Sequence, residues 1–161
     1  MNIRMKFKKH GCMKFIGHLD IMRYFQKAIR RADIDIAYSE GFSPHMIMSF
    51  AAPLGVGLTS EGEYVDLQVN SCASSKAAVD ALNSVMVDGM EVVSFKLLPE
   101  TVKNAMASVA AADYFVNFRE GYAPENWEEK FMAFLQKEEM LIVKKTKRSE
   151  AEVDLKPMLY K

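Results

Sequence analysis

The sequence has few cysteines, no long apolar run and no excess of either charge sign. Two cysteines, Cys12 and Cys72, among 161 residues are too few for a disulfide framework or an all-cysteine metal site. They also lie too far apart in the chain to supply the clustered thiolates of an iron–sulfur cluster. No apolar run approaches the roughly 20 residues of a membrane span, and residues 1–6 contain no apolar core of a secretory signal. We therefore expect a cytoplasmic protein with no membrane partner.

The motifs of nucleotide-binding enzymes and metalloenzymes are also missing. Gly55-Val56-Gly57 lacks the third glycine and the following helix of a dinucleotide-binding fingerprint, and no Walker loop is present. Histidines and carboxylates are scattered along the chain, without the close spacing of metal ligands. We expect neither a metal ion nor a cofactor.

Charge is divided unevenly along a chain whose formal net charge is zero. Residues 1–31 contain nine Lys and Arg against one acidic residue, Asp20, and the remaining residues contain twelve basic and twenty acidic ones. This division favours a surface that faces a polyanion. The alternative is that these cations lie beside the acidic remainder of the same protein.

The hydrophobic pattern predicts an α+β fold in residues 1–98. Alternation over residues 3–9 is typical of a half-buried strand, and the period changes to helical over residues 18–32. Further strands are predicted at residues 46–50, 64–69 and 90–98, with a second helix at residues 75–87. The order β-α-β-β-α-β favours a ferredoxin-like sheet with two helices on one face.

The second half of the chain predicts a partial repeat of this topology. Residues 99–112 are an Ala-rich connector, and residues 113–161 form a partial second ferredoxin-like unit. Within it we expect a β-α-β unit with strands at 113–119 and 140–147 around a helix at 124–136, and one more strand at 153–160. Because the repeat stops early, either the chain is truncated or it lends a sheet edge to a partner.

The first predicted helix carries a stripe of cations along about two turns, formed by Arg23, Lys27, Arg30 and Arg31. Such spacing suits repeated phosphates better than one small ligand. Tyr38 and Phe42 lie nearby in sequence and could stack on unpaired bases. Alternatively, Phe42 belongs to the core and the arginines pair with glutamates, or the stripe docks an acidic patch of a protein.

Residues 1–70 contain the motifs Lys14-Phe15-Ile16-Gly17-His18-Leu19-Asp20, Arg30-Arg31-Ala32, Tyr38-Ser39-Glu40-Gly41-Phe42-Ser43-Pro44-His45, Ser49-Phe50-Ala51, Pro53-Leu54-Gly55-Val56-Gly57 and Ser60-Glu61-Gly62-Glu63-Tyr64. Together these motifs resemble the bacterial radical-SAM-linked protein family, a domain of unknown function encoded beside radical-SAM proteins or fused to them. The family usually has Ser where this chain has Gly17. The resemblance implies an accessory module that works with a radical-SAM enzyme, in modification of RNA.

Loop residues of these motifs predict a pocket beside the first helix. His18, Asp20 and His45 are the candidate catalytic groups, as general acids and bases. The expected pocket residues are Glu40, Gly41, Phe42, Ser43, Pro44, Ser60, Glu61 and Glu63. The structural alternative is that His18 and Asp20 only tie loops to the helix.

Three functions are consistent with these patterns. The first is a non-catalytic module that binds RNA or another polyanion for a radical-SAM partner. The second is a protein-docking subunit that binds no nucleic acid. The third is a small RNA-cleaving or RNA-modifying enzyme that uses His18 or His45.

Overall fold

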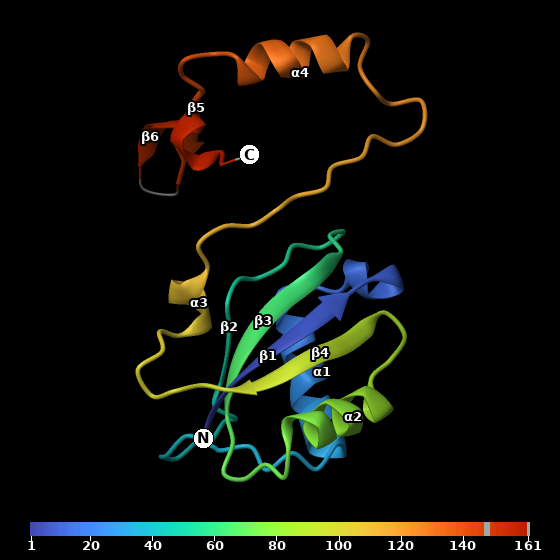
Figure 1. Ribbon diagram of the computed structural model, residues 1–161, viewed down its shortest axis with the longest axis vertical. Coiled ribbons are helices and arrows are strands. Elements are labelled where there is room, and N and C mark those ends of the chain that lie inside the picture. The colour runs from blue at the N-terminus through green and yellow to red at the C-terminus, as the bar shows by residue number, and fades with distance from the viewer. Residues whose placement is uncertain (147–148, 161) are drawn as a thin grey trace. The chain divides into compact units, whose positions relative to one another are not determined.

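The computed structural model describes residues 1–146 and 149–160 (Figure 1). Lys147, the last residue of the strand predicted at 140–147, lies outside the described residues. The chain forms two compact units, Met1–Ala112 and Asp113–Lys161.

The first unit is a four-stranded antiparallel sheet with two helices on one face, and all of its residues are described (Figure 1). The strands are β1 Asn2–Lys9, β2 Met48–Phe50, β3 Ser60–Gln68 and β4 Met90–Leu97, and the helices are α1 His18–Arg31 and α2 Ser75–Val85. The strand order is β2-β3-β1-β4, with every neighbouring pair antiparallel. This topology confirms the predicted ferredoxin-like fold.

The core of the first unit lies between the sheet and the two helices. Alternation along β1 places Ile3, Met5 and Phe7 on the helix side, where each is buried. The apolar stripe of α1 includes Phe25, whose ring centroid lies 4.6 Å from that of Phe7 and 5.8 Å from that of Phe50. Burial of these aromatic rings fixes which face of α1 points away from the sheet, toward solvent.

The strand boundaries differ from those predicted in the middle of the unit. β3 begins at Ser60 instead of residue 64, because Glu63 pairs with Phe7 and Ser60 pairs with Lys9 across an irregularity in the β1–β3 register. β2 is shorter than predicted and begins at Met48, while Met46 forms only an isolated bridge to Tyr38. The start of β3 consists of Gly and polar residues, so hydrophobic alternation does not predict it.

The two helices of the first unit begin with different caps. In α2 the Ser74 hydroxyl accepts a hydrogen bond from the Ala77 backbone N–H at 3.0 Å, as an N-cap serine typically does. In α1 the N-cap is Gly17, which has no side chain to offer. The first N–H groups of α1 therefore lack a side-chain acceptor at the cap.

The face of the sheet opposite α1 and α2, called here the open face, carries a short helix, α3 Ala105–Ser108. Asp66 on β3 holds this segment, because its Oδ2 accepts a hydrogen bond from the Ala105 backbone N–H at 2.6 Å. Arg4 on β1 donates to the Lys103 carbonyl at 2.9 Å. These contacts bind residues 103–105 to strands β1 and β3 of the sheet.

The second unit contains α4 Trp127–Leu135, the hairpin of β5 Leu141–Lys145 and β6 Glu150–Asp154, and a 3₁₀ turn Lys156–Met158 (Figure 1). Asp154 organises the end of the hairpin, where its Oδ1 accepts from the backbone N–H groups of Met140 at 2.8 Å and Lys156 at 3.0 Å. These two hydrogen bonds lower the pKa of the Asp154 carboxyl.

Of the strands predicted in the second unit, one is wrong and one is partly right. Residues 113–119 form no strand, and of the strand predicted at 153–160 only residues 153 and 154 belong to β6, while residues 155–160 form a turn and irregular structure. A strand needs a hydrogen-bonding partner as well as apolar alternation. Within the described residues, β5 and β6 pair with each other and leave residues 113–119 without a partner strand.

Candidate functional site

The outward face of α1 carries four exposed cations, Arg23, Lys27, Arg30 and Arg31, called here the basic face. The opposite stripe of α1 is buried against the sheet, so these side chains point to solvent. Arg23 forms one exposed ion pair, 3.2 Å from Nη1 to Asp20 Oδ1. No carboxylate of the described residues lies within 4.0 Å of the other three cations.

The cations of β1 behave differently from those of α1. Arg4 forms a bidentate pair with Asp66, at 2.8 Å and 3.0 Å, and this hydrogen bonding raises the pKa of the guanidinium. Lys8 lies between Glu61 at 3.6 Å and Glu91 at 3.4 Å. Pairing with the acidic remainder of the chain thus accounts for much of the charge on β1 and little of the charge on α1.

A shallow hollow adjoins the basic face, lined by Tyr24, Lys27, Arg30, Arg31 and Val87. The Tyr24 hydroxyl accepts a hydrogen bond from the Val87 backbone N–H at 2.9 Å and lies 3.1 Å from Met86 Sδ. Arg31 Nη2 donates to the Val85 carbonyl at 2.7 Å. Because these contacts hold Tyr24 and Arg31 in place, the hollow combines a fixed aromatic ring with cations.

His18 and Asp20 lie in the first turn of α1 but do not interact with each other. The ring of His18 packs edge-on against Phe50, with centroids 5.2 Å apart. Asp20 pairs with Arg23 and sits where the helix dipole favours a carboxylate. Both contacts are of the structural kind, and the catalytic role of either residue stays a prediction.

His45 belongs to the loop that joins α1 to β2, where it is bound to Ser39. Its Nδ1 lies 2.8 Å from Ser39 Oγ, and its backbone N–H donates to the same oxygen at 3.1 Å. The residues between them are exposed at Glu40, Gly41, Phe42, Ser43 and Pro44. Phe42 is fully exposed, so the interpretation that places it in the core is wrong.

The third group of predicted residues lies at the start of β3. Ser60 Oγ donates to Glu63 Oε1 at 2.7 Å and accepts from the Gly62 N–H at 3.1 Å. Glu61 is exposed and lies 3.2 Å from His10 Nε2. Within residues 1–112, no hydrogen bond or ion pair links Glu63 to His18 or His45. Glu63 lies close enough to act on the charge of Lys9, whose Nζ donates to the Ile16 carbonyl, two residues before His18.

Lys9, a buried lysine that pairs with Ser60 at the start of β3, was not predicted from the sequence as a candidate functional residue. Lys9 is only 1% exposed, and its Nζ donates to the Ile16 carbonyl at 3.0 Å. Burial lowers the pKa of the Lys9 amine, and the nearby charge of Glu63 opposes that effect. The alternation of Ile3, Met5 and Phe7 continues to Lys9, which is the signal that could have identified it.

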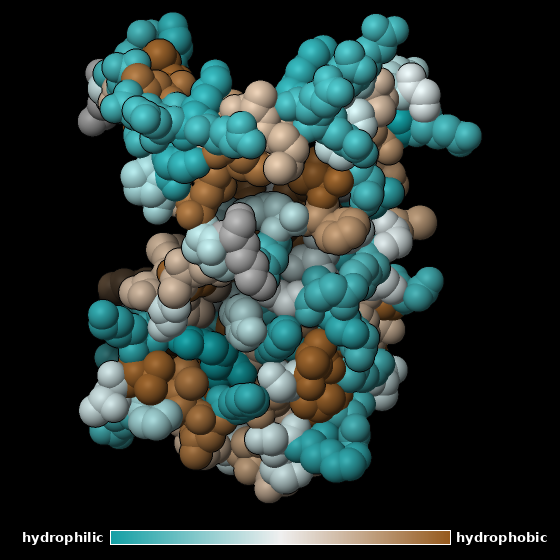
Figure 2. All heavy atoms as spheres, turned by 45° about the horizontal axis from the view of Figure 1, so that its top comes forward, coloured by the Kyte–Doolittle hydropathy of each residue, from teal (hydrophilic) through white to brown (hydrophobic). Residues whose placement is uncertain are grey.

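Exposed apolar side chains surround the start of α1. Phe15 and Leu19 are each 66% exposed, and Val56 is 64% exposed. The loop containing Val56 is joined to the 3₁₀ helix Gly11–Phe15, because the Gly57 N–H donates to the Lys14 carbonyl at 2.7 Å. In the space-filling view, hydrophobic side chains lie on the surface among hydrophilic ones (Figure 2).

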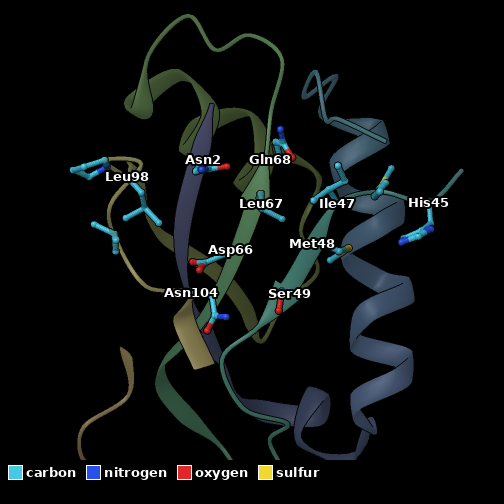
Figure 3. Close-up of a pocket in the computed structure, with 13 residues that line it drawn as sticks. Asn2, His45, Ile47, Met48, Ser49, Asp66, Leu67, Gln68, Leu98 and Asn104 are labelled. Carbon is cyan, nitrogen blue, oxygen red and sulfur yellow. The ribbon is translucent and has the colours of Figure 1, made fainter. Parts of the chain in front are cut away.

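A second hollow lies on the open face of the sheet and was not predicted from the sequence (Figure 3). Its polar lining comes from β1, β2, β3 and the segment before α3, and it consists of Asn2, Ser49, Asp66, Gln68 and Asn104, with His45 at its edge. These residues are spread over about a hundred positions of the sequence. Only the sheet register, which pairs Asn2 with Gln68 and Ser49 with Asp66, brings them together.

Residues 1–146 and 149–160 contain no group of three or more His, Cys, Asp or Glu placed to hold a metal ion. None of the helices in that part of the chain is both long and apolar enough to cross a lipid bilayer. Cys12 and Cys72 are free thiols there.

Comparison with known proteins places the chain in a family. No curated protein and no solved structure matches the sequence. One family model, described as an uncharacterized protein conserved in bacteria (DUF2344), matches residues 2–161, which is nearly the whole chain. The chain therefore belongs to the DUF2344 family of uncharacterized bacterial proteins.

Proposed function

We propose that this chain is an accessory module of the bacterial cytoplasm that binds single-stranded RNA along α1 and presents it to a radical-SAM enzyme. The observation that carries the proposal is the basic face, where Lys27, Arg30 and Arg31 are exposed and have no carboxylate partner in the described residues. A cation that already has an internal partner gains little from a phosphate. The charges of these three cations stay uncompensated, because the one hydrogen bond of Arg31, to the Val85 carbonyl, is to an uncharged group.

The spacing of the basic face suits a chain of phosphates. Arg23 and Arg30 are separated by seven residues of α1, which corresponds to about 10 Å along the helix axis. Binding several phosphates at once releases several counterions, so the affinity falls steeply with salt. A single small anion would need the cations to converge on one point, whereas these project from successive turns of a straight helix.

The hollow beside the basic face supports RNA over a featureless polyanion. The ring of Tyr24 is held by its hydroxyl contacts to Met86 and Val87, and Lys27 and Arg30 lie beside it. Unpaired RNA bases are recognised by stacking on aromatic or guanidinium planes. Phe42 is exposed and offers a further aromatic surface on the loop after α1.

The radical-SAM part of the proposal is supported by the motifs that resemble the radical-SAM-linked family, above all the stretch from Tyr38 to His45. The chain contains two cysteines, too few to ligate a cluster by thiolates. An accessory role is therefore consistent with the composition. The partner would supply the radical chemistry, and this chain would bind the RNA substrate and present it.

The proposal is tested by binding of a short unstructured RNA, such as a 12-nucleotide oligouridylate, measured by fluorescence anisotropy. The variant Arg23→Ala/Lys27→Ala/Arg30→Ala removes three cations of the basic face. Its affinity should fall by about tenfold or more at low salt, because each lost phosphate contact removes released counterions.

A matched control removes the same charge elsewhere. Lys76, Lys96 and Lys144 are exposed on α2, β4 and β5, and their triple alanine variant has the same net charge as the test variant. The control should bind the RNA nearly as tightly as the unmodified chain. Equal losses in both variants would mean that overall charge, and not the basic face, determines binding, and the proposal would be wrong.

A second candidate function is protein docking, favoured by the exposed apolar side chains Phe15, Leu19 and Val56 at the start of α1. In this case the complex with a radical-SAM protein survives nuclease and is lost in Leu19→Asp. Loss of the complex after nuclease treatment, with Leu19→Asp harmless, would reject docking and leave RNA as the link.

A further inference from the structure

The hollow on the open face is separate from the basic face. Its strand residues Asn2, Ser49 and Gln68 belong to β1, β2 and β3, whose opposite side packs against α1. A ligand bound there does not touch the cations of α1. The loop from Leu98 to Asn104 forms one wall, so the hollow is bounded by strands and by a connecting segment (Figure 3).

The polar side chains that line the hollow have unused hydrogen-bonding capacity. Within residues 1–112, all of which are described, the side chains of Asn2, Ser49 and Gln68 make no hydrogen bond to protein. Asn104 uses only its Oδ1, which accepts from the Ala107 N–H at 2.9 Å, and its Nδ2 stays available. Three amides and one hydroxyl therefore offer both donors and acceptors around one space.

No lysine, arginine or unpaired carboxylate lines this hollow in residues 1–112. Its one carboxylate, Asp66, accepts two hydrogen bonds from Arg4 and one from the Ala105 N–H, so both oxygens are occupied. Arg4 in turn donates to the Lys103 carbonyl. A charged ligand would find no counter-charge here, whereas an uncharged ligand with mixed donors and acceptors finds matching groups.

Apolar side chains complete the lining. Leu98, Pro99 and Val102 lie on the wall segment, whereas the side chain of Met48, which pairs with the buried Leu67, points toward α1 and the core (Figure 3). A site with apolar walls and a few convergent polar groups is the usual design for a small organic ligand. The walls suit the faces of a flat ring, while the amides suit its edges.

We propose that the open-face hollow binds the uncharged base of a nucleoside. Purine and pyrimidine edges present adjacent donors and acceptors, and asparagine and glutamine amides pair with them in two-point contacts. Asn2 and Gln68 face each other across the β1–β3 register, which positions two such amides side by side. The base comes either from a free nucleoside or from an unpaired position of RNA.

The test uses the full chain, labelled with ¹⁵N, and titrations with adenosine, guanosine, cytidine and uridine in turn. At least one nucleoside should shift the amide signals of Asn2, Ser49, Gln68 and Asn104 saturably, with a Kd of about 1 mM or tighter. Asn2→Ala/Gln68→Ala should weaken this binding about tenfold. Asn117→Ala removes an exposed amide from the second unit and should leave it unchanged.

Further measurements distinguish a free nucleoside from an unpaired base of RNA, and they distinguish this proposal from the proposed RNA binding along α1. A 12-nucleotide RNA that shifts the same four signals identifies an unpaired base as a ligand, and shifts with nucleosides alone identify a free nucleoside. The triple variant of the basic face should keep nucleoside binding while losing RNA affinity. The proposal is overturned if none of the four nucleosides gives saturable shifts up to about 10 mM, or if the shifts persist undiminished in Asn2→Ala/Gln68→Ala.

Discussion

At the scale of single residues, this chain has Gly17 where the family that its motifs resemble usually has serine. The structure shows that the glycine leaves α1 without a side-chain cap. Gly17 has φ −74° and ψ 165°, an extended conformation that serine adopts without strain. A Cβ at this position would lie 3.8 Å from Val56 Cγ2, an ordinary contact. The hydroxyl would meet the N–H groups that the glycine leaves uncapped.

Gly17→Ser should therefore raise the free energy of unfolding by roughly 0.5–1 kcal/mol, through the new cap and the reduced freedom of the unfolded chain. Urea unfolding followed by circular dichroism measures the change. Ser74→Gly removes the hydroxyl that caps α2 and should shift stability in the opposite direction. A Gly17→Ser variant that is less stable than the unmodified chain would contradict this account of the cap.

Lys9 gives a pH-dependent prediction. Its folded-state pKa lies below the ordinary value of 10.5, because burial disfavours the charged amine. The unfolded state then binds more protons between the two pKa values, so the contribution of Lys9 to stability rises with pH across that window.

Comparison with Lys9→Met isolates this contribution. The difference in unfolding free energy, unmodified chain minus variant, should be constant at lower pH and should increase as the pH approaches 10.5. Unfolding at a series of pH values between 7 and about 10 measures it. A difference that is flat or falls over this range would show that the Lys9 amine is not desolvated in the folded state.

At the scale of elements, the parts that sequence predicts well are those with a strong period and a single buried face. The alternation of Ile3, Met5 and Phe7 and the helical stripe through Phe25 identified β1 and α1 within one or two residues. Both patterns reflect burial against one core, so local sequence carries the information. Local sequence does not show which partner strand a segment pairs with. This is why residues 113–119 were predicted as a strand that the structure lacks.

The candidate site was harder to predict because it depends on register. Local charge was enough to identify Arg23, Lys27 and Arg30 as an exposed face. Asn2 and Gln68 lie side by side because β1 pairs with β3, a strand about sixty residues away in the sequence. No local pattern encodes this pairing.

Phe25 tests the core that holds α1 against the sheet. It is fully buried and contacts the rings of Phe7, Tyr24 and Phe50. Phe25→Ala should lower the free energy of unfolding by about 3–5 kcal/mol, through lost burial and a cavity. Phe42→Ala removes the same side chain from an exposed loop and should change stability by less than about 0.5 kcal/mol. Similar losses in the two variants would contradict the assigned core.

At the scale of the whole molecule, the first unit contains a complete hydrophobic core. The buried cluster runs from Ile3 to Phe95, and the contacts of Asp66 and Arg4 bind the segment up to Ala105. The second unit has far less of its apolar surface buried, and Met140 is the residue buried there among those described.

Residues 1–112 alone should therefore fold. The isolated fragment is expected to give dispersed amide signals in NMR and a cooperative thermal transition, because every strand and helix of the ferredoxin-like unit lies within it. Circular dichroism and ¹⁵N–¹H spectra provide the measurement. A fragment without dispersed signals would show that residues 113–161 are needed for the first unit to fold.

Binding of RNA phosphates by the exposed cations of α1 is tested most directly by the salt dependence of the affinity. The slope of log K against log salt concentration should be steep for the unmodified chain. It should be smaller by about 1.4 to 2 for Arg23→Ala/Lys27→Ala/Arg30→Ala, since each single-strand phosphate contact contributes about 0.7 and Arg23 already pairs with Asp20. The Lys76/Lys96/Lys144 control should keep the original slope. Equal slopes for the unmodified chain and the α1 variant would contradict the claim.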